Sequence, residues 1–479
     1  MKVNDKKVDK QDRKLTRRKF VGSSAAAAAA AFTIVPGCVL GRSAQPAPSQ
    51  KINLAFIGVG DQGRGNMGDL LNLDDVQVVA LCDVDTKVDY GEMGHGIAGL
   101  DSALSRVERH NADRTGSSSY KGCTGYADFR EMLDSEDGID AVVVSTPDHV
   151  HAVACMAAIK KGKHVYCEKP LTHSVYETRM VTEAARKAGV MTQMGNHGHS
   201  GEGIRVAVEW IQDGAIGPVR EVHGYTGSGA SSWLNINSRP EDRPSVPDTL
   251  DWDLWLGPAP HRPYHPVYHP YNWRGWWDFG TGGIGDMACH NVDPAFWALD
   301  LGYPTSVEST ATGMTDETVP VAAVHRYEFP ARGDMPPVTM YWHDGEARPP
   351  RPPGLEESRR FRGGNGIYFV GDDGVITMSG WAESPRIVPE SKMKAYKQPE
   401  KSIPRLRGHH RGWIDACKSG KPVHGNFDYS GPMTEAILLG NVALRTGKKI
   451  LWDGRNMRAT NAPEADKHIK PAFREGWSL

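Results

Sequence analysis

Two short strings in this sequence combine side chains that can hold and move protons. The first is Glu168-Lys169-Pro170, and the second is segment 282–290, in which a glycine turn precedes Asp286 and His290. Lysine can donate hydrogen bonds to an oxygen that gains negative charge, and histidine can transfer protons near neutral pH. A helix would place Asp286 and His290 on one face, where the carboxylate could fix the histidine tautomer or stabilise the histidine cation. The strings predict a proton-transfer site; a surface lysine and a buried structural histidine are the simpler alternatives.

The same histidine has a second possible use. His197 and His199 lie in another His-containing string, and either could join Asp286 and His290 around a metal ion. The cysteines show no C-x-x-C pair, so they do not indicate a zinc site or a disulfide framework. We expect no metal, with the histidine cluster as the open alternative.

A nucleotide site is predicted further towards the N-terminus. The apolar run 52–57 leads directly into Gly58, Gly60 and Gly63, and a second apolar run, 76–81, ends near Asp83. Glycines at this spacing permit a tight turn, close approach of a pyrophosphate and close packing of the next helix, whose N-terminus attracts phosphate. We expect Asp61 and Gln62, at the start of that helix, to take part in cofactor binding.

The acidic residue decides which dinucleotide the turn favours. Asp83 can accept hydrogen bonds from a ribose diol and would repel a 2′-phosphate, so NAD is favoured over NADP. NADP stays an alternative because Arg64 lies near the phosphates. An unrelated α/β domain with a glycine-rich turn is the competing interpretation.

Two further strings follow strands of the same predicted sheet. Ser145-Thr146-Pro147, with His149, comes after the apolar run 139–144, and Glu168 comes after the run 164–167. Open α/β sheets bind ligands at the carboxyl ends of their strands, so we expect these residues near the cofactor.

The elements that position these residues change character along the chain. Strands alternate with helices up to Gly195, which predicts a doubly wound parallel sheet. Beyond it, period-two segments such as 338–342 and a hairpin around 371–374 predict an α+β domain with an open, mostly antiparallel sheet. We predict a signal and linker over 1–50, a Rossmann domain over 51–195 and a second α+β domain over 196–479.

An aromatic stretch lies in the second half. Its rings and imidazoles are Trp252, Trp255, His261, Tyr264, His265, Tyr268, His269, Tyr271, Trp273, Trp276 and Trp277. Such rings suit the C–H faces of sugars, and they suit an interface or a core equally well. From this stretch and the preceding His string, we take His197, Arg274 and Trp276 as candidate substrate contacts.

Composition and the N-terminus bear on compartment and partners. With 39% hydrophobic and 24% charged residues and a net charge of -2, nothing in the sequence indicates nucleic acid. Residues 16–22 match a twin-arginine export pattern and precede an uncharged, alanine-rich stretch, 23–40. We expect export, either to the periplasm after ordinary cleavage or as a lipoprotein anchored through Cys38.

Taken in order, these strings resemble the Gfo/Idh/MocA family of oxidoreductases. They are Gly58-x-Gly60-x-x-Gly63, Ser145-Thr146-Pro147-x-His149, Glu168-Lys169-Pro170 and Asp286-x-x-x-His290. The resemblance implies a Rossmann domain, NAD or NADP, sugar or polyol substrates and a homo-oligomer. It implies Lys169 as the catalytic lysine, Asp286 and His290 as its partners in proton transfer, and Glu168 and the turn 145–149 beside the nicotinamide ribose.

Export constrains the reaction, because no free pyridine nucleotide pool is expected outside the cytoplasm. We therefore expect NAD to stay bound. The predicted function is oxidation of a hydroxyl of a sugar, polyol or glycoside. The alternatives are a redox-neutral NAD-dependent glycosidase or keto-glycoside lyase and, in a third class, a non-catalytic sugar or nucleotide binding protein.

Overall fold

The computed structural model describes residues 46–91, 96–234, 236, 238–361 and 363–479. Residues Ile52–Leu479 form one compact unit. The predicted export segment and Cys38 lie outside the described residues. Within the described part of the chain, none of the helices has the length and apolar character needed to cross a membrane.

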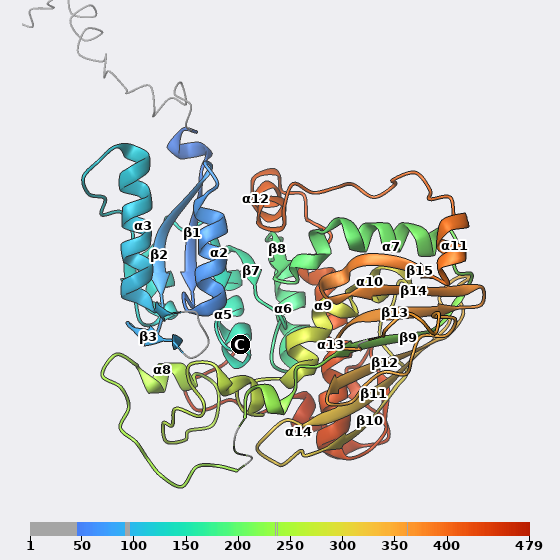
Figure 1. Cartoon of the computed structure of the whole chain (residues 1–479). Coiled ribbons are helices and arrows are strands. Elements are labelled where there is room, and N and C mark those ends of the chain that lie inside the picture. The colour runs from blue at the N-terminus through green and yellow to red at the C-terminus, as the bar shows by residue number, and fades with distance from the viewer. Residues whose placement is uncertain (1–45, 92–95, 235, 237, 362) are drawn as a thin grey trace, which may run out of the picture. The chain divides into compact units, whose positions relative to one another are not determined.

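A six-stranded parallel sheet organises the first half, with strand order β5-β2-β1-β6-β7-β8 (Figure 1). Its strands are β1 (Ile52–Ile57), β2 (Val76–Cys82), β5 (Thr124–Tyr126), β6 (Ala141–Val144), β7 (His164–Cys167) and β8 (Thr192–Met194). The helices between them are α2 (Asp61–Leu71), α3 (Leu100–Thr115), α4 (Phe129–Ser135), α5 (Asp148–Lys160) and α6 (Val175–Ala188). All four residues of β6 are buried, as expected for a strand covered on both faces.

The register of this sheet brings the predicted strings to one edge. Ile57 pairs with Cys82 and with Val144, Val144 pairs with Cys167, and Cys167 pairs with Met194. Since the strands are parallel, the residues that follow them leave the sheet at the same edge. The glycine turn, Asp83, Ser145 and Glu168 are therefore neighbours in space. In the sequence, 110 positions separate Gly58 of the turn from Glu168.

A nine-stranded sheet organises the second half, with order β15-β14-β13-β9-β12-β11-β10-β16-β17. Its strands are β9 (Val219–Thr226), β10 (Ser306–Thr312), β11 (Ala322–Phe329), β12 (Val338–Gly345), β13 (Asn365–Gly371), β14 (Gly374–Ser379), β15 (Glu383–Val388), β16 (Ile450–Asp453) and β17 (Arg458–Ala459). Among the described pairings of this nine-stranded sheet, only β9–β12 is parallel. The prediction of a Rossmann sheet followed by a mostly antiparallel sheet is therefore confirmed.

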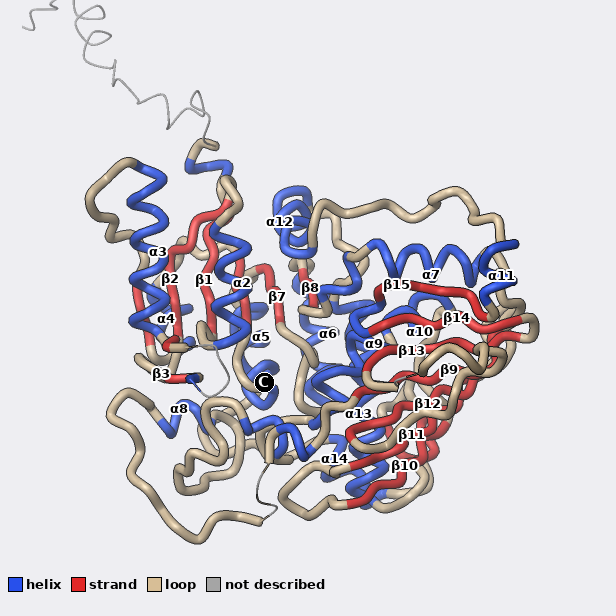
Figure 2. The backbone as a smooth tube through the Cα atoms, viewed as in Figure 1, coloured by secondary structure: helices blue, strands red, loops and turns tan. Residues whose placement is uncertain are grey.

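Helices of the second half lie beside this sheet and beside the first half (Figure 1). They are α7 (Glu202–Gln212), α8 (Trp252–Leu256), α9 (Cys289–Asn291), α10 (Asp293–Ala298), α11 (Glu390–Ala395), α12 (His409–Ser419), α13 (Phe427–Thr446) and α14 (Asp466–Ile469). A small hairpin, β3 (Val88–Asp89) and β4 (Ile97–Ala98), follows β2. Figure 2 shows that the chain between β9 and α8 is mainly loop.

Several contacts tie the second half to the first, and two of them lie near the carboxyl edge of the parallel sheet or in its apolar core. Helix α12 packs Trp413 and Ile414 into the apolar cluster that contains Phe56 and Tyr166 of the parallel sheet. His269 lies 3.0 Å from the Asp85 carboxylate, just beyond β2. The aromatic loop, which is the aromatic stretch of residues 252–277, is thereby held over the carboxyl edge of the parallel sheet, where the candidate site forms. The predicted domain limits, 51–195 and 196–479, stay a prediction.

Candidate active site

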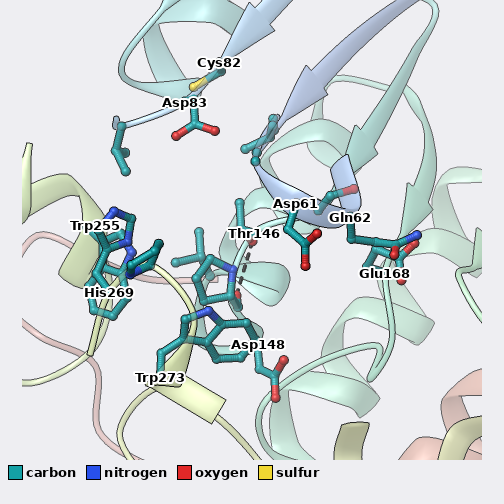
Figure 3. A pocket seen from close by; sticks show the side chains of 18 of the residues that line it. Asp61, Gln62, Cys82, Asp83, Thr146, Asp148, Glu168, Trp255, His269 and Trp273 are labelled. Atoms are coloured by element: carbon teal, nitrogen blue, oxygen red, sulfur yellow. Dashed lines mark hydrogen bonds between the residues drawn. The ribbon is translucent and has the colours of Figure 1, made fainter. Parts of the chain in front are cut away.

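The carboxyl edge of the parallel sheet opens into a cleft of about 1210 Å³, a volume that includes the solvent at its mouth, and residues of both halves line it. Figure 3 shows Asp83 at one side of this cleft and Glu168 beside Gln62 at the other. The predicted residues that line it are Gly58, Gly60, Asp61, Gln62, Asp83, Ser145, Thr146, Pro147, Glu168, Lys169, Arg274 and Asp286. The parallel register thus gathers most of the predicted site in one place.

The glycine turn is shaped by close backbone contacts. Gly58 has φ +86°, a conformation that L side chains rarely adopt, and a Cβ there would lie 2.6 Å from the Ser145 carbonyl oxygen. A Cβ on Gly63 would lie 2.1 Å from the Gly58 carbonyl oxygen, so any side chain would push helix α2 away from the turn. Gly60 begins α2 without a side-chain cap, which leaves the N-terminal N–H groups directed at the cleft. This cradle fits a pyrophosphate.

Asp83 is oriented by the backbone around it. Its Oδ2 accepts a hydrogen bond from the Val59 N–H at 2.8 Å, and its Oδ1 accepts one from the Asp85 N–H at 3.0 Å. Each carboxylate oxygen can accept a second bond. A fixed carboxylate with free acceptor capacity at the end of β2 fits a ribose diol, and its charge opposes a 2′-phosphate.

Lys169 and Asp286 form an ion pair in the cleft, supplied by the two different halves of the chain. Lys169 Nζ donates to Asp286 Oδ1 at 2.7 Å and to the Asp286 carbonyl oxygen at 2.8 Å. Burial alone would lower the pKa of Lys169, but the Asp286 carboxylate more than offsets it, so the pKa is raised. Burial would raise the pKa of Asp286, and Lys169 and Arg274 together lower it. Lys169 is therefore held as an ammonium.

Glu168 is a buried carboxylate with polar neighbours from three parts of the chain. The Asn66 amide donates to its Oε1 at 2.9 Å, and His197 Nε2 lies 3.8 Å from the same oxygen. Burial raises the pKa of this group, but His197, Asn66 and Lys169 outweigh burial and lower the pKa to about 2. The cleft therefore carries a fixed negative charge directly before Lys169, where the positive nicotinamide ring of an oxidised cofactor would be stabilised.

His290 differs from its prediction. Residues Ile284–Ala288 form a π-helical turn, which has a wider repeat than an α-helix, so positions four apart no longer align. Asp286 bonds Lys169 instead, and among the described residues His290 Nδ1 has no hydrogen-bond partner. Burial lowers the pKa of His290 to about 3, so the ring is neutral. His290 lies behind the cleft lining, and the prediction that Asp286 fixes its tautomer is wrong.

His149 also lies away from the cleft. It sits in α5, fully buried, with ring nitrogens 3.2 Å from the Phe279 carbonyl and 3.0 Å from the Trp255 carbonyl. Its neighbour Asp148 lines the cleft instead, and accepts hydrogen bonds from the Thr281 N–H and hydroxyl. The turn 145–147 therefore faces the cleft, whereas His149 joins the two halves structurally.

The aromatic stretch divides between core and cleft. Trp276 is fully buried in a cluster with Trp252, Tyr268 and Phe279, so it cannot contact substrate as predicted. Trp255, His269, Tyr271 and Trp273 line the cleft, as does Arg274. Arg274 lies over the rings of Trp273 and Tyr271, with its Nε 3.8 Å from Asp286 Oδ1.

His197 and His199, the two candidate metal ligands, have separate hydrogen-bond partners. His197 contacts the Tyr166 hydroxyl and Glu168, whereas His199 pairs with Asp293 at 2.9 Å and with His424. Within the described part of the chain, no three metal-ligating side chains converge. The two histidines thus serve separate hydrogen-bond networks.

Other cleft residues were not predicted. Tyr90 lies over the glycine turn, where its hydroxyl would be 2.5 Å from a Cβ on Gly60, and Trp477 lines the cleft from the C-terminal end of the chain. Only long-range packing brings them there, and no local pattern marked either. Asp148 could have been found, since it lies inside the string that follows β6.

Comparison with known proteins identifies both halves. Residues 97–196 match the model of an oxidoreductase family's NAD-binding Rossmann fold, and residues 218–330 match the same family's C-terminal alpha/beta domain. These ranges contain Glu168-Lys169-Pro170 and Asp286 with His290. The chain belongs to the Gfo/Idh/MocA family of oxidoreductases. Its first half is therefore the family's NAD-binding domain.

Curated relatives in this family match only part of the chain. Levoglucosan dehydrogenase of Pseudarthrobacter phenanthrenivorans is 25% identical over 35% of this chain and 35% of its own length. The 1,5-anhydro-D-fructose reductase of Ensifer adhaerens is 28% identical over 40% and 46%. A glycosyl hydrolase family 109 protein of Shewanella pealeana is 26% identical over 36% and 34%. Each match thus spans less than half of the relative.

Solved structures share the fold over most of the chain. The WlbA dehydrogenase of Bordetella pertussis, determined with NADH and UDP-GlcNAcA, superposes with a TM-score of 0.53 at 18% identity, covering 84% of this chain and 99% of WlbA. Aldose-aldose oxidoreductase of Caulobacter crescentus gives 0.51 at 16% identity, covering 84% and 100%. At these identities the likeness shows the Gfo/Idh/MocA fold alone.

Proposed function

We propose that this protein is an NAD-dependent oxidoreductase that acts on a hydroxyl of a sugar, polyol or glycoside. One observation carries the proposal: a single cleft joins the glycine turn and Asp83 to the Lys169–Asp286 ion pair. A dinucleotide bound by the first two features would extend towards the third. The dehydrogenase and reductase names among the relatives support sugars as the substrate class.

Lys169 is placed to hold the reacting oxygen. Its ammonium has three N–H groups, and two bond Asp286 in the described structure, which leaves the third for a substrate hydroxyl. As the hydroxyl becomes a carbonyl, Nζ passes one proton to Asp286, 2.7 Å away, and accepts the hydroxyl proton in its place, so that Lys169 stays an ammonium. Bound NAD would accept the hydride. Participation of His290 in proton transfer stays a prediction.

Replacement of Lys169 by alanine tests this role. The variant is expected to lose sugar-dependent reduction of NAD while retaining its nucleotide, because Asp83 and the glycine turn are unchanged. Nucleotide content is measured by mass spectrometry after denaturation. Unchanged turnover would contradict the role of Lys169, and a non-catalytic binding protein would show no turnover even before the substitution.

We also propose that the protein is exported and keeps its NAD bound. The twin-arginine pattern at residues 16–22 supports export, since free pyridine nucleotide is not expected outside the cytoplasm. Protein purified without added nucleotide should therefore release a stoichiometric amount of NAD or NADH on denaturation. Protein that carries none would contradict retention. A homo-oligomer and acylation of Cys38 stay predictions.

A redox-neutral glycosidase or lyase is the second candidate, favoured by the match to a glycosyl hydrolase family 109 protein. In that reaction, oxidation of a sugar hydroxyl acidifies the neighbouring C–H, the glycosidic bond is eliminated, and the hydride returns. Product analysis separates the two candidates. Net oxidation yields a keto sugar with reduced cofactor or a reduced second substrate, whereas redox-neutral cleavage yields free sugar and aglycone without net reduction.

A further inference from the structure

The turn between β14 and β15 presents a tryptophan to solvent. Trp381 is 48% exposed, and it is the most exposed tryptophan of the described residues. Its backbone has φ +57°, as does that of Ala382, and Ser384 has φ +51°. Left-handed conformations are uncommon for residues with a Cβ, and they persist where the surrounding structure enforces them.

The surroundings of Trp381 enforce this conformation. The Trp381 N–H donates to the Asn291 side chain, which itself bonds the Tyr225 carbonyl and Asn365. A Cβ on Gly198 would lie 2.2 Å from the Trp381 carbonyl oxygen, so the 3₁₀ turn His197–Ser200 packs directly on this backbone. The backbone that carries the exposed ring is therefore held in one conformation, which suits a ring that binds a ligand.

A second cavity lies beside this ring. It is open to solvent, and its volume of about 780 Å³ includes the solvent at its mouth. Its lining is formed by His197, Gly198, Gly201, Glu202, Gly203, Trp381, Glu383 and Ser384. Glu202 is held by Lys401 and Arg405, each at 2.9 Å. One exposed ring among carboxylate, imidazole and hydroxyl groups matches a pyranose, which offers an apolar C–H face and a rim of hydroxyls.

This cavity borders the proposed reaction centre. The ring centroids of Trp381 and His290 are 6.1 Å apart, and His197 Nε2 lies 3.8 Å from the Glu168 carboxylate. His197 thus lines the cavity on one side and contacts the residue before Lys169 on the other. His197 and Glu168 thus separate this cavity from Lys169, and a second sugar ring would reach Trp381 by passing His197.

We propose that Trp381 and this cavity form a subsite for a second sugar ring, so that the substrate is a disaccharide or larger glycoside. The proposal rests on the proposed function for the position of the first ring. The indole stacks on the C–H face of the second ring, while His197, Glu383 and Ser384 bond its hydroxyl groups.

Fluorine NMR of protein labelled with fluorotryptophan tests the subsite without requiring turnover. The thirteen tryptophans give separate probes, and the Trp381→Phe variant assigns the resonance of Trp381. The probes are maltose, cellobiose, lactose and melibiose, with glucose and galactose as single rings. We expect at least one disaccharide to shift the Trp381 resonance and neither monosaccharide to do so.

Substitution gives the second readout. Trp381→Leu should weaken binding of that disaccharide by about tenfold or more, about 1.4 kcal/mol, because the flat ring is lost. Leu451→Ala removes another exposed apolar side chain, on β16, and should leave binding unchanged. If no disaccharide shifts the resonance, the subsite is refuted. It is also refuted if dilution alone shifts the resonance, since Trp381 would then contact a second copy of the chain.

Failure of the proposed function has a different signature. If disaccharides shift the Trp381 resonance but no sugar reduces bound NAD, the subsite stands and sugar oxidation falls. If sugars reduce NAD while Trp381 is unaffected by all of them, sugar oxidation stands and the subsite falls.

Discussion

Replacement of Asp286 by asparagine should lower the pKa of Lys169 and destabilise the fold. The two side chains are 17% and 19% exposed and lie 2.7 Å apart. Burial and Arg274 both lower the pKa of Lys169, and Asp286 is the main group that raises it. Without this carboxylate, Glu168 alone opposes the lowering influences.

The expected magnitude follows from the geometry of the pair. A hydrogen bond to a charged group contributes about 1.5–3 kcal/mol, so its loss corresponds to a fall of about 1–2 units in the pKa of Lys169. A raised lysine pKa contributes stability that is present below the unfolded pKa and is lost as pH rises through the folded value. In the variant this contribution to stability disappears. Stability at neutral pH should fall by a similar 1.5–3 kcal/mol.

Two measurements check this prediction. The pKa of Lys169, followed by the pH dependence of its modification by an amine reagent, should be about 1–2 units lower in the variant, whereas single-turnover reduction of bound NAD should be lost because asparagine cannot accept the proton. Urea unfolding gives the stability change. Asp372→Asn is the matched control, since it breaks the exposed Arg220–Asp372 pair at 2.9 Å and should leave stability nearly unchanged, because solvent screens an exposed pair. An unchanged pKa of Lys169, with a stability loss no larger than the control's, would refute the role of the ion pair.

Three further substitutions test the cofactor end of the cleft and its charge. Gly63→Ala should lose bound NAD, because its Cβ would meet the Gly58 carbonyl oxygen at 2.1 Å. Gly65→Ala, whose Cβ meets nothing within 4 Å, is the control, and equal NAD contents in the two variants would contradict the role of the glycine turn. Glu168→Gln should be less stable by about 3 kcal/mol at neutral pH, because the pKa of Glu168 is lowered to about 2 in the folded protein. This stability is present above the ordinary carboxyl pKa and is lost as pH falls through the folded value, so parallel acid-unfolding curves for the variant and the unsubstituted protein would contradict the prediction. Asp83→Ser should raise the affinity for NADP relative to NAD, measured by titration of nucleotide-free protein, and an unchanged ratio would show that Asp83 does not select the cofactor.

The cofactor end of the site was predictable because its determinants are local. Strand β1, the glycine turn, α2 and β2 follow one another in sequence, and each is specified by an apolar run or by glycines whose backbone must approach another segment closely. Parallel pairing then carries Ser145 and Glu168 to the same edge, so strand ends alone were sufficient to collect them. The partnership of Lys169 with Asp286 depended on the resemblance to a known family.

Predictions about side-chain direction were less successful, for a definite reason. The α-helical repeat assumed for Asp286 and His290 does not hold in a π-helical turn, and that choice depends on packing between β9, α13 and the turn itself. His149 and Trp276 have residue types that suit a site and a core equally, and burial between the two halves placed both in the core. Trp381 lies in a turn whose left-handed backbone is imposed by neighbours distant in sequence.

By itself the sequence determined the order of strands and helices in the first half, the dinucleotide turn, Asp83 and the strand-end positions of Ser145 and Glu168. These follow from hydrophobic periodicity and from glycine's freedom, which act over a few residues. Only the tertiary structure decided which residues of the second half complete the cleft: Arg274 and Asp286 face Lys169, whereas Trp276 and His290 are buried behind the lining. The physical reason is that these positions depend on long-range packing, in which α12 and the aromatic loop pack onto the parallel sheet. No local pattern in the sequence encodes which of their side chains then point into the cleft.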